Sequence, residues 1–210
     1  MDSIRQHLPH FPVNHEQTRR LNWLADPGDF FLLILMLIPA VFPLLRDGFP
    51  QTADGNLHLL RLVLLDHQVS HGVFLPQWTP QLFLGYGYPV FHFYAPATYY
   101  LGLLLTWVGL SHARAFIGVF VVLTLLGGVG MRLLACDVLS ADARQPARWP
   151  ALLSAVAYAY SPYLLTNIYV RGAIAELGAQ ALLPWIFWSF RRLFRTANPA
   201  AYVLPAALSL

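Results

Sequence analysis

The sequence predicts an all-α polytopic membrane protein, because its composition is apolar and its apolar runs extend along the whole chain. The 210 residues are 57% hydrophobic and only 11% charged, whereas a soluble domain carries about 25% charged residues. A single cysteine, Cys136, excludes an internal disulfide framework. The net charge of +3 is small and the arginines form no basic stripe, so nucleic-acid binding is not expected. The composition therefore indicates the membrane class.

The first membrane span is expected over 30–45, between Asp29 and Arg46. Its sequence, FFLLILMLIPAVFPLL, is slightly shorter than the roughly 20 residues that a spanning helix needs. The polar stretch 1–29 carries charges of both signs, and no small-residue cleavage site follows the apolar run. We therefore interpret 1–29 as a cytoplasmic tail before an uncleaved anchor rather than as a secretory signal. Further apolar runs occupy 97–110, 115–135, 151–166, 178–190 and 200–210.

The positions of the arginines indicate which of these runs cross the membrane. Lys and Arg collect on the cytoplasmic side, and a span over 97–110 would put Arg132, the arginines of 136–149 and the RRLFR segment outside. The run 97–110 is short and carries two tyrosines and a tryptophan, which is typical of a helix lying at the headgroup level. We therefore expect an interfacial helix over 97–110 inside an external loop, 46–114. The membrane domain, 30–210, then has spans near 30–45, 115–135, 151–166 and 178–190, and an incomplete one at 200–210. Because the chain ends inside an apolar run with no closing charge, we expect these four to five spans to be the N-terminal part of a longer protein.

The external loop contains an acid, a histidine and an arginine close together. If 54–70 is helical, Asp54, His58 and Arg61 are separated by four and three residues and share one face. The helix would begin near Thr52 or Asp54, both good N-caps, and stop at Gly72, with its leucines on another face. Two interpretations stay open. The three side chains form a functional site, or Asp54 caps the helix and the others face solvent.

Two further features on the same side of the membrane have a structural and a functional interpretation. Trp78, Tyr86 and Tyr88 lie among other aromatics around two glycines. They form either an interfacial belt or the wall of a groove for sugar rings or an isoprenoid tail. In the second external loop, Arg171 and Glu176 form a mutual ion pair, or Arg171 holds a phosphate through bidentate hydrogen bonds.

Three segments of the chain resemble a known group of proteins. They are DGNLHLLRL, GVFLPQWTPQLFLGYGYPVFHFYAPATYYLGLLL and YSPYLLTNIYVRGAIAELGAQALLPWIFW, and the resemblance covers roughly 46–190. They are similar to the bacterial 6-pyruvoyl-tetrahydropterin-synthase-related membrane proteins. Those proteins in turn look like the GT-C glycosyltransferases, membrane enzymes that use polyprenyl-phosphate sugars. The zinc-ligating histidine triad of a soluble pterin enzyme is not visible in this sequence.

The resemblance implies a GT-C-like helical bundle and a role for each candidate site residue. Asp54 is the candidate catalytic acid-base, and His58 orients it or shares its proton. Arg171 and Arg61 are candidates for the lipid phosphate. The remaining substrate-binding candidates are Trp78, Tyr86, Tyr88 and Glu176. The second external loop has no Asp-x-Asp motif, so no metal ligand is assigned and dependence on a divalent metal is left open.

The function implied is transfer of a sugar from a polyprenyl-phosphate donor to a glycan, lipid or protein acceptor. The protein would lie in a bacterial inner membrane, with a cytoplasmic N-terminus and its site on the external face. A transporter or lipid-handling protein is the alternative, because a charged cluster near a membrane also suits a substrate path. A structural protein of the envelope is a third interpretation. Charges that lie in loops rather than at mid-span favour the enzyme.

Overall fold

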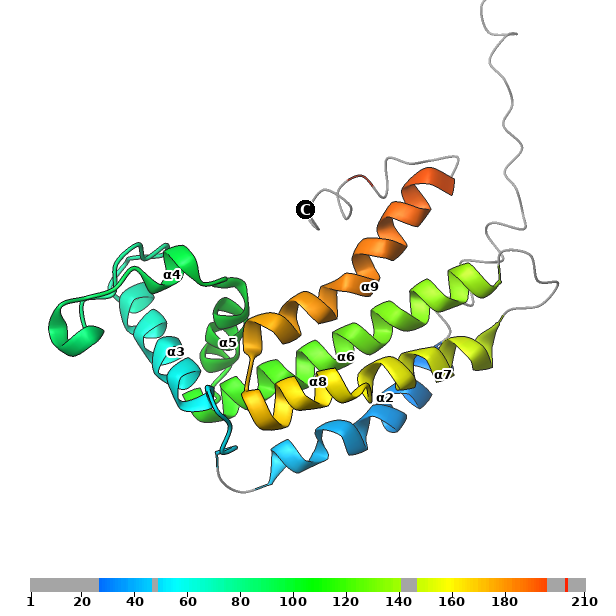
Figure 1. The fold of residues 1–210 in the computed structure, drawn as a ribbon, viewed down its shortest axis with the longest axis horizontal. Coiled ribbons are helices and arrows are strands. Elements are labelled where there is room, and N and C mark those ends of the chain that lie inside the picture. The colour runs from blue at the N-terminus through cyan, green and yellow to red at the C-terminus, as the bar shows by residue number, and fades with distance from the viewer. Residues whose placement is uncertain (1–26, 47–48, 141–146, 196–202, 204–210) are drawn as a thin grey trace, which may run out of the picture.

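The described part of the chain is built of helices joined by loops, as the sequence predicts. The structure is a computed structural model that describes residues 27–46, 49–140, 147–195 and 203 (Figure 1). No β-strand occurs among these residues, and their sole extended pairing is an isolated antiparallel bridge between Thr79 and Tyr88. The tail before residue 27 and most of the expected 200–210 span lie outside the described residues.

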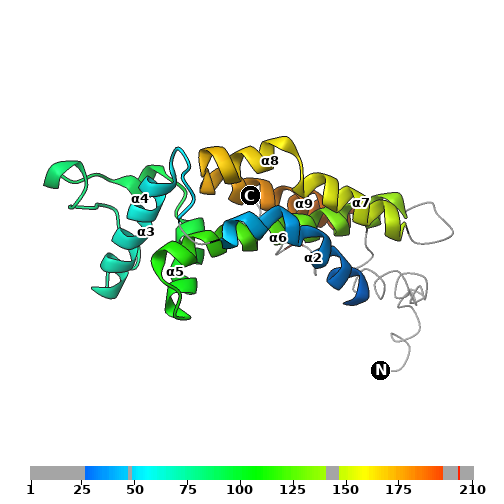
Figure 2. The same ribbon diagram turned by 90° about the horizontal axis from the view of Figure 1, so that it is seen from below.

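Four long helices lie side by side, and α6 is central because it contacts each of the other three (Figures 1 and 2). They are α2 (Pro27–Val41), α6 (His112–Leu139), α7 (Arg148–Ala159) and α9 (Ile174–Arg195). The other described elements gather mainly beyond one end of this bundle. They are η2 (Phe42–Leu45), α3 (Gly55–Ser70), η3 (Phe83–Gly85), α4 (Val90–Phe93), α5 (Ala97–Trp107), α8 (Pro162–Thr166) and the π-helical turn η4 (Asn167–Arg171).

Two of the described helices are long and apolar enough to cross a membrane, Pro27–Leu45 and His112–Leu139. They contain the expected spans 30–45 and 115–135. The expected span 151–166 is not one continuous helix, because α7 ends at Ala159 and a new helix begins at Pro162. A proline at the first helical position can start a helix but cannot continue one, since it lacks the N–H. The segment 178–190 lies inside α9. The arrangement of four to five spans stays a prediction.

Close contact between α6 and α9 depends on small residues. A Cβ atom at Gly127 would lie only 3.3 Å from the Cα atom of Ala181, so the two backbones approach closely at this point. One residue before Gly127, the carbonyl of Leu126 accepts a hydrogen bond of 2.9 Å from the Trp185 indole. Small residues with interhelical hydrogen bonds are the usual means of packing helices whose surroundings are apolar.

A buried carboxylate joins three of the long helices at one end of the bundle. Asp29, in the first turn of α2, is only 3% exposed. One of its oxygens lies 2.7 Å from Nη2 of Arg132 in α6, and the other pairs with Arg148 at the start of α7. Arg132 is itself 1% exposed and also lies over the Phe30 ring, 4.6 Å from its centroid. The start of α2 is therefore fixed against the C-terminal half of α6.

A second carboxylate joins α6 to α9 at the same end. Asp137 pairs with Nε of Arg191 at 2.9 Å and with Nη2 of Arg192 at 3.0 Å. Since α2 begins where α6 ends, the two helices are antiparallel. The chain therefore leaves η2 and enters α6 at the opposite end, after passing through α3, α4 and α5 (Figure 1).

We predict that Asp29→Asn destabilises the full chain by about 3–5 kcal/mol, because Arg132 would stay buried without its counter-charge. Thermal unfolding of the purified protein in detergent measures the change. The control is Asp66→Asn, since Asp66 is 24% exposed in its pair with His112, and exposed pairs contribute about 0–1 kcal/mol. A stability of Asp29→Asn equal to that of Asp66→Asn would contradict the prediction.

Candidate functional site

The N-terminus of α3 is fixed by the second loop of the predicted external side. Asp54 occupies the N-cap position of α3, is exposed, and its side chain forms no capping hydrogen bond. Its backbone N–H donates to the carbonyl of Arg171 at 2.9 Å, and that of Ala53 donates to Val170 at 3.0 Å. The two loops therefore meet through the backbone. Because the carboxylate makes no capping bond, the structure does not support capping as the role of Asp54.

A glycine makes this meeting of the loops feasible. Gly172 follows the π-helical turn η4 and has a φ of 71°, in the left-handed region that favours glycine. A Cβ atom at this position would contact the Thr52 side chain and lie 3.2 Å from the backbone nitrogen of Gly55. Both the conformation and the close approach therefore require a residue without a side chain.

His58 lies inside the protein, behind Asp54. It is 2% exposed, and its Nδ1 lies 2.6 Å from the hydroxyl of Tyr99. Burial, helped by the nearby Arg61 cation and opposed by Asp54, lowers the pKa of His58 to about 4. The imidazole is therefore neutral at pH 7. The expectation that His58 faces solvent if it is not catalytic is wrong, because His58 packs among Tyr94, Tyr99 and Phe116.

Tyr99 links the histidine to Arg61. Burial raises the pKa of the Tyr99 hydroxyl, so the hydroxyl keeps its proton and can donate it to His58. The same oxygen accepts a long hydrogen bond of 3.4 Å from Nη1 of Arg61. These roles assign the remaining imidazole proton of His58 to Nε2. His58 is thus oriented toward Tyr99, and its influence on Asp54 is electrostatic.

Arg61 is a cation with unused binding capacity. Its guanidinium lies 4.7 Å from the centroid of the Tyr94 ring, a cation–π contact. Among the described residues its buried Nε has no hydrogen-bond partner, and no carboxylate lies within 4.0 Å of it. A buried donor without a partner is costly, so an anionic ligand that accepted from it would be bound favourably.

Arg171 forms the ion pair that the sequence allowed as one interpretation. Its two terminal nitrogens lie 2.5 and 2.6 Å from the two carboxylate oxygens of Glu176. Tyr163 donates to Glu176 at 3.0 Å, and Asn167 accepts from Arg171 at 2.9 Å. The hydrogen bonds from Arg171 lower the pKa of Glu176, and Glu176 raises the pKa of Arg171. In this state the guanidinium is committed to Glu176, which leaves Arg61 as the better-placed cation for an anionic ligand.

These groups form one electrostatic unit, which we call the polar cluster: Asp54, His58, Arg61, Tyr94, Tyr99, Arg171 and Glu176. Tyr94 connects the two halves of the cluster. Its pKa is raised mainly by burial, and it responds to the charges of all four ionised members of the cluster. The structure therefore brings together five of the eight candidate site residues from two distant parts of the sequence.

The three aromatic candidates lie elsewhere. Trp78, Tyr86 and Tyr88 belong to a hairpin-like loop that follows the C-terminal end of α3 (Figure 1). Asp54 lies at the other end of this helix, which is about 24 Å long for its 16 residues. The tip is exposed and strained, because Phe83 and Leu84 both have positive φ angles, 51° and 59°. The structure does not place this loop against the polar cluster.

The polar cluster does not have the composition of a metal site. Among the residues that the structure describes, no three His, Cys, Asp or Glu side chains gather at metal-binding distance. Both carboxylate oxygens of Glu176 bond to Arg171, so Asp54 is the one acid of the cluster left to a ligand. These residues do not fit a divalent cation, and the chemistry proposed below uses none.

Sequence reasoning missed Tyr94, Tyr99, Tyr163 and Asn167. Tyr99 was expected to lie at the headgroup level, yet it is 0% exposed. It follows His58 by 41 residues, a separation at which no local pattern predicts contact. The one available signal was the need of a buried histidine for a hydrogen-bond partner.

We predict that the protein loses stability as the pH falls from about 6.5 toward 4, because the unfolded chain protonates His58 before the folded chain does. This contribution is complete above pH 6.5 and amounts to about 3 kcal/mol in all. The unfolding midpoint of His58→Gln, which keeps a hydrogen-bonding group beside Tyr99 and does not titrate, should depend less on pH. The exposed His92→Gln serves as the control, and equal pH slopes in all three proteins would contradict the lowered pKa.

Comparison with known proteins finds a distant relative. The chain matches no protein-family model and no solved structure. It is 21% identical over 179 residues to an uncharacterized protein of Lactococcus lactis subsp. cremoris (strain MG1363). The matched region covers 85% of this chain and 29% of the relative, so this chain corresponds to less than a third of that protein's length.

Proposed function

We propose that the chain is part of a polytopic membrane protein that transfers a sugar from a polyprenyl-phosphate donor to an acceptor hydroxyl, as a GT-C-type glycosyltransferase. One observation carries the proposal. The exposed Asp54 carboxylate forms no capping bond, and its backbone is fixed in the same cluster as Arg61, a cation with an unused buried donor. An acid open to an acceptor, and in the same cluster a cation that can stabilise a leaving phosphate, are the two groups that the reaction requires.

The proposed reaction is a single displacement at the anomeric carbon. The acceptor oxygen attacks this carbon, and the bond from the carbon to the phosphate oxygen breaks. The phosphate leaves with the bonding electron pair, and the Asp54 carboxylate takes the proton of the acceptor hydroxyl. The configuration at the anomeric carbon is inverted, because attack and departure occur on opposite faces.

The other residues of the polar cluster support these two roles. Arg61 stabilises the charge that develops on the departing phosphate. Tyr99 hydrogen-bonds both His58 and Arg61, and the His58 and Tyr99 side chains remain neutral, so they add no competing charge. Arg171 helps to fix Asp54 through its backbone carbonyl, and its pair with Glu176 stabilises the loop. His58, Arg171 and Glu176 are positioning residues in this scheme.

The two ends of the bundle support the membrane placement that we propose. The arginines that pair with Asp29 and Asp137 gather at one end, which the positive-inside rule assigns to the cytoplasm. The polar cluster lies at the other end, where η2 leaves the first apolar helix and α6 begins (Figure 1). This arrangement supports an external site and an interfacial position for α5.

We predict that Asp54→Asn lowers sugar transfer at least about 100-fold, because an amide cannot accept the acceptor's proton. Folding should be unchanged, since the exposed Asp54 side chain forms no capping hydrogen bond and Asn has nearly the same shape. Membranes that contain the full-length protein are supplied with polyprenyl-phosphate sugars, and the transferred sugar is measured. Asp66→Asn, in the same helix, is the control.

Two outcomes of this experiment would oppose the proposal. Wild-type transfer by Asp54→Asn would exclude Asp54 from the chemistry. No transfer by the wild-type protein with any donor would favour the transport alternative.

We predict opposite accessibility for cysteines placed at the two ends of the bundle. In a Cys136→Ala background, Gln81→Cys should react with a membrane-impermeant maleimide in intact cells, and Arg195→Cys should react only after permeabilisation. Both positions are exposed in the structure, so the bilayer alone decides the difference. Labelling of Arg195→Cys in intact cells would show the topology to be wrong.

A further inference from the structure

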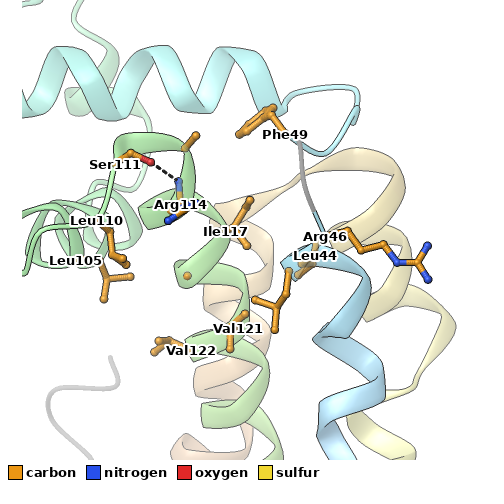
Figure 3. A pocket seen from close by; sticks show the side chains of 13 residues that line it. Leu44, Arg46, Phe49, Leu105, Leu110, Ser111, Arg114, Ile117, Val121 and Val122 are labelled. Carbon is orange, nitrogen blue, oxygen red and sulfur yellow. Dashed lines mark hydrogen bonds between the residues drawn. The ribbon is translucent and has the colours of Figure 1, made fainter.

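A cavity separate from the polar cluster lies between η2, which continues α2, the end of α5 with the turn that joins it to α6, and the first turns of α6. Its volume is about 670 Å³ (Figure 3). The walls are apolar and include Leu44, Leu105, Ile117, Val121 and Val122. The lining thus involves both helices that are long enough to cross a membrane. We call this cavity the α2–α6 groove.

Two arginines distinguish the α2–α6 groove from an ordinary apolar surface. Arg46 directly follows η2 and Arg114 lies in the first turn of α6, and both line the groove. Neither has a carboxylate within 4.0 Å among the residues that the structure describes. In Figure 3 the Arg46 guanidinium points away from the groove. Its side chain is exposed, and exposed side chains change rotamer within nanoseconds. Apolar walls and two arginines without a carboxylate partner among the described residues complement an anionic amphiphile.

The groove and the polar cluster share a wall. Phe49 lines the groove, and its ring lies 5.5 Å from that of Phe116 between centroids. On the other side, Phe116 lies 6.4 Å from His58 between ring centroids. Phe49 also reaches the start of α3, because a Cβ atom at Gly55 would lie 3.3 Å from its ring. A ligand whose chain filled the groove would therefore have its head close to Asp54.

We propose that the α2–α6 groove binds the apolar chain of a phosphate-bearing lipid with a single chain, and that Arg46 and Arg114 bind its phosphate. Arginine suits this role because its planar guanidinium donates two parallel hydrogen bonds to phosphate oxygens. The assignment of the chain as isoprenoid rests on the proposed function. Arg61 would then act on the same phosphate from the side of the polar cluster, as it separates from the sugar.

The experiment uses the full chain in nanodiscs and farnesyl phosphate that carries a diazirine in its chain. After irradiation, mass spectrometry should locate adducts in 105–122 or 44–46. Unlabelled farnesyl phosphate should compete, whereas farnesol and inorganic phosphate should compete at least about tenfold less, since each lacks half of the recognition. Adducts elsewhere, or equal competition by farnesol, would overturn the proposal. Equal competition by a diacyl phosphatidate would overturn the single-chain assignment.

Variants test the binding of the phosphate head and the binding of the apolar lipid chain separately. The double variant Arg46→Gln, Arg114→Gln should reduce labelling at least about tenfold. Arg195→Gln, which replaces an exposed arginine far from the groove in the sequence, should leave labelling unchanged. Val122→Trp should fill the groove and reduce labelling, with Val138→Trp as the matched control on the same helix. Both valines are substantially exposed, 37% and 44%, so neither replacement has to enter the core. Unchanged labelling in both groove variants would overturn the proposal.

The failure of this proposal can be distinguished from failure of the proposed function. Asp54→Asn should label like the wild-type protein, because binding in the groove requires no proton transfer. Labelling of the groove without sugar transfer from any donor would support the lipid site and oppose the enzyme. Undiminished sugar transfer by the groove variants would oppose the lipid site but would still support the proposed glycosyltransferase activity.

Discussion

The architecture depends on the buried carboxylate of Asp29. A charge that is 3% exposed must be paired, and its partners Arg132 and Arg148 lie more than 100 residues away in the sequence. Since an unpaired buried charge costs several kcal/mol, arrangements that separate α2 from α6 and α7 are strongly disfavoured. This one constraint makes α2 and α6 antiparallel. It therefore brings the exit from η2 and the entry to α6 to the same end of the bundle.

The polar cluster forms at that end of the bundle as a consequence of the antiparallel arrangement of α2 and α6. The chain between η2 and α6 contributes Asp54, His58 and Arg61. The π-helical turn η4, which follows α7 and α8 in the sequence, contributes Arg171. Two backbone hydrogen bonds and the left-handed Gly172 join these pieces. π-Helical turns are rare and are frequently found at functional sites. Here the turn presents its carbonyls to the first residues of α3, so the position of Asp54 is set by backbone rather than by side chains.

Burial divides the ionisable groups of the cluster into two kinds. His58 is enclosed by aromatic rings and stays neutral, while Asp54 is exposed and Arg61 keeps an unused donor. A neutral buried core beneath an exposed acid gives that acid a rigid support and adds no charge beside it. Phe49 and Phe116 lie between this core and the α2–α6 groove, so the core and the groove share an aromatic wall.

Composition and periodicity were enough to predict the helical class, the apolar helices that contain 30–45 and 115–135, and the helix that begins after Asp54. These are local properties, because apolar runs and capping residues act within a few turns. The helix break within 151–166 could also have been predicted from Pro162, but a prediction from hydropathy alone does not detect it.

The face of α3 that packs could not be predicted. His58 is buried while Leu57 and Leu60 are 43% and 46% exposed, because the neighbours of α3 supply a hydrogen bond to the histidine. The sequence by itself thus determined the helical class and offered the ionisable candidates, Asp54, His58, Arg61, Arg171 and Glu176. Only the tertiary structure decided which of them meet, since Tyr99 reaches His58 and the Arg171 carbonyl reaches Asp54 across separations that no local pattern encodes.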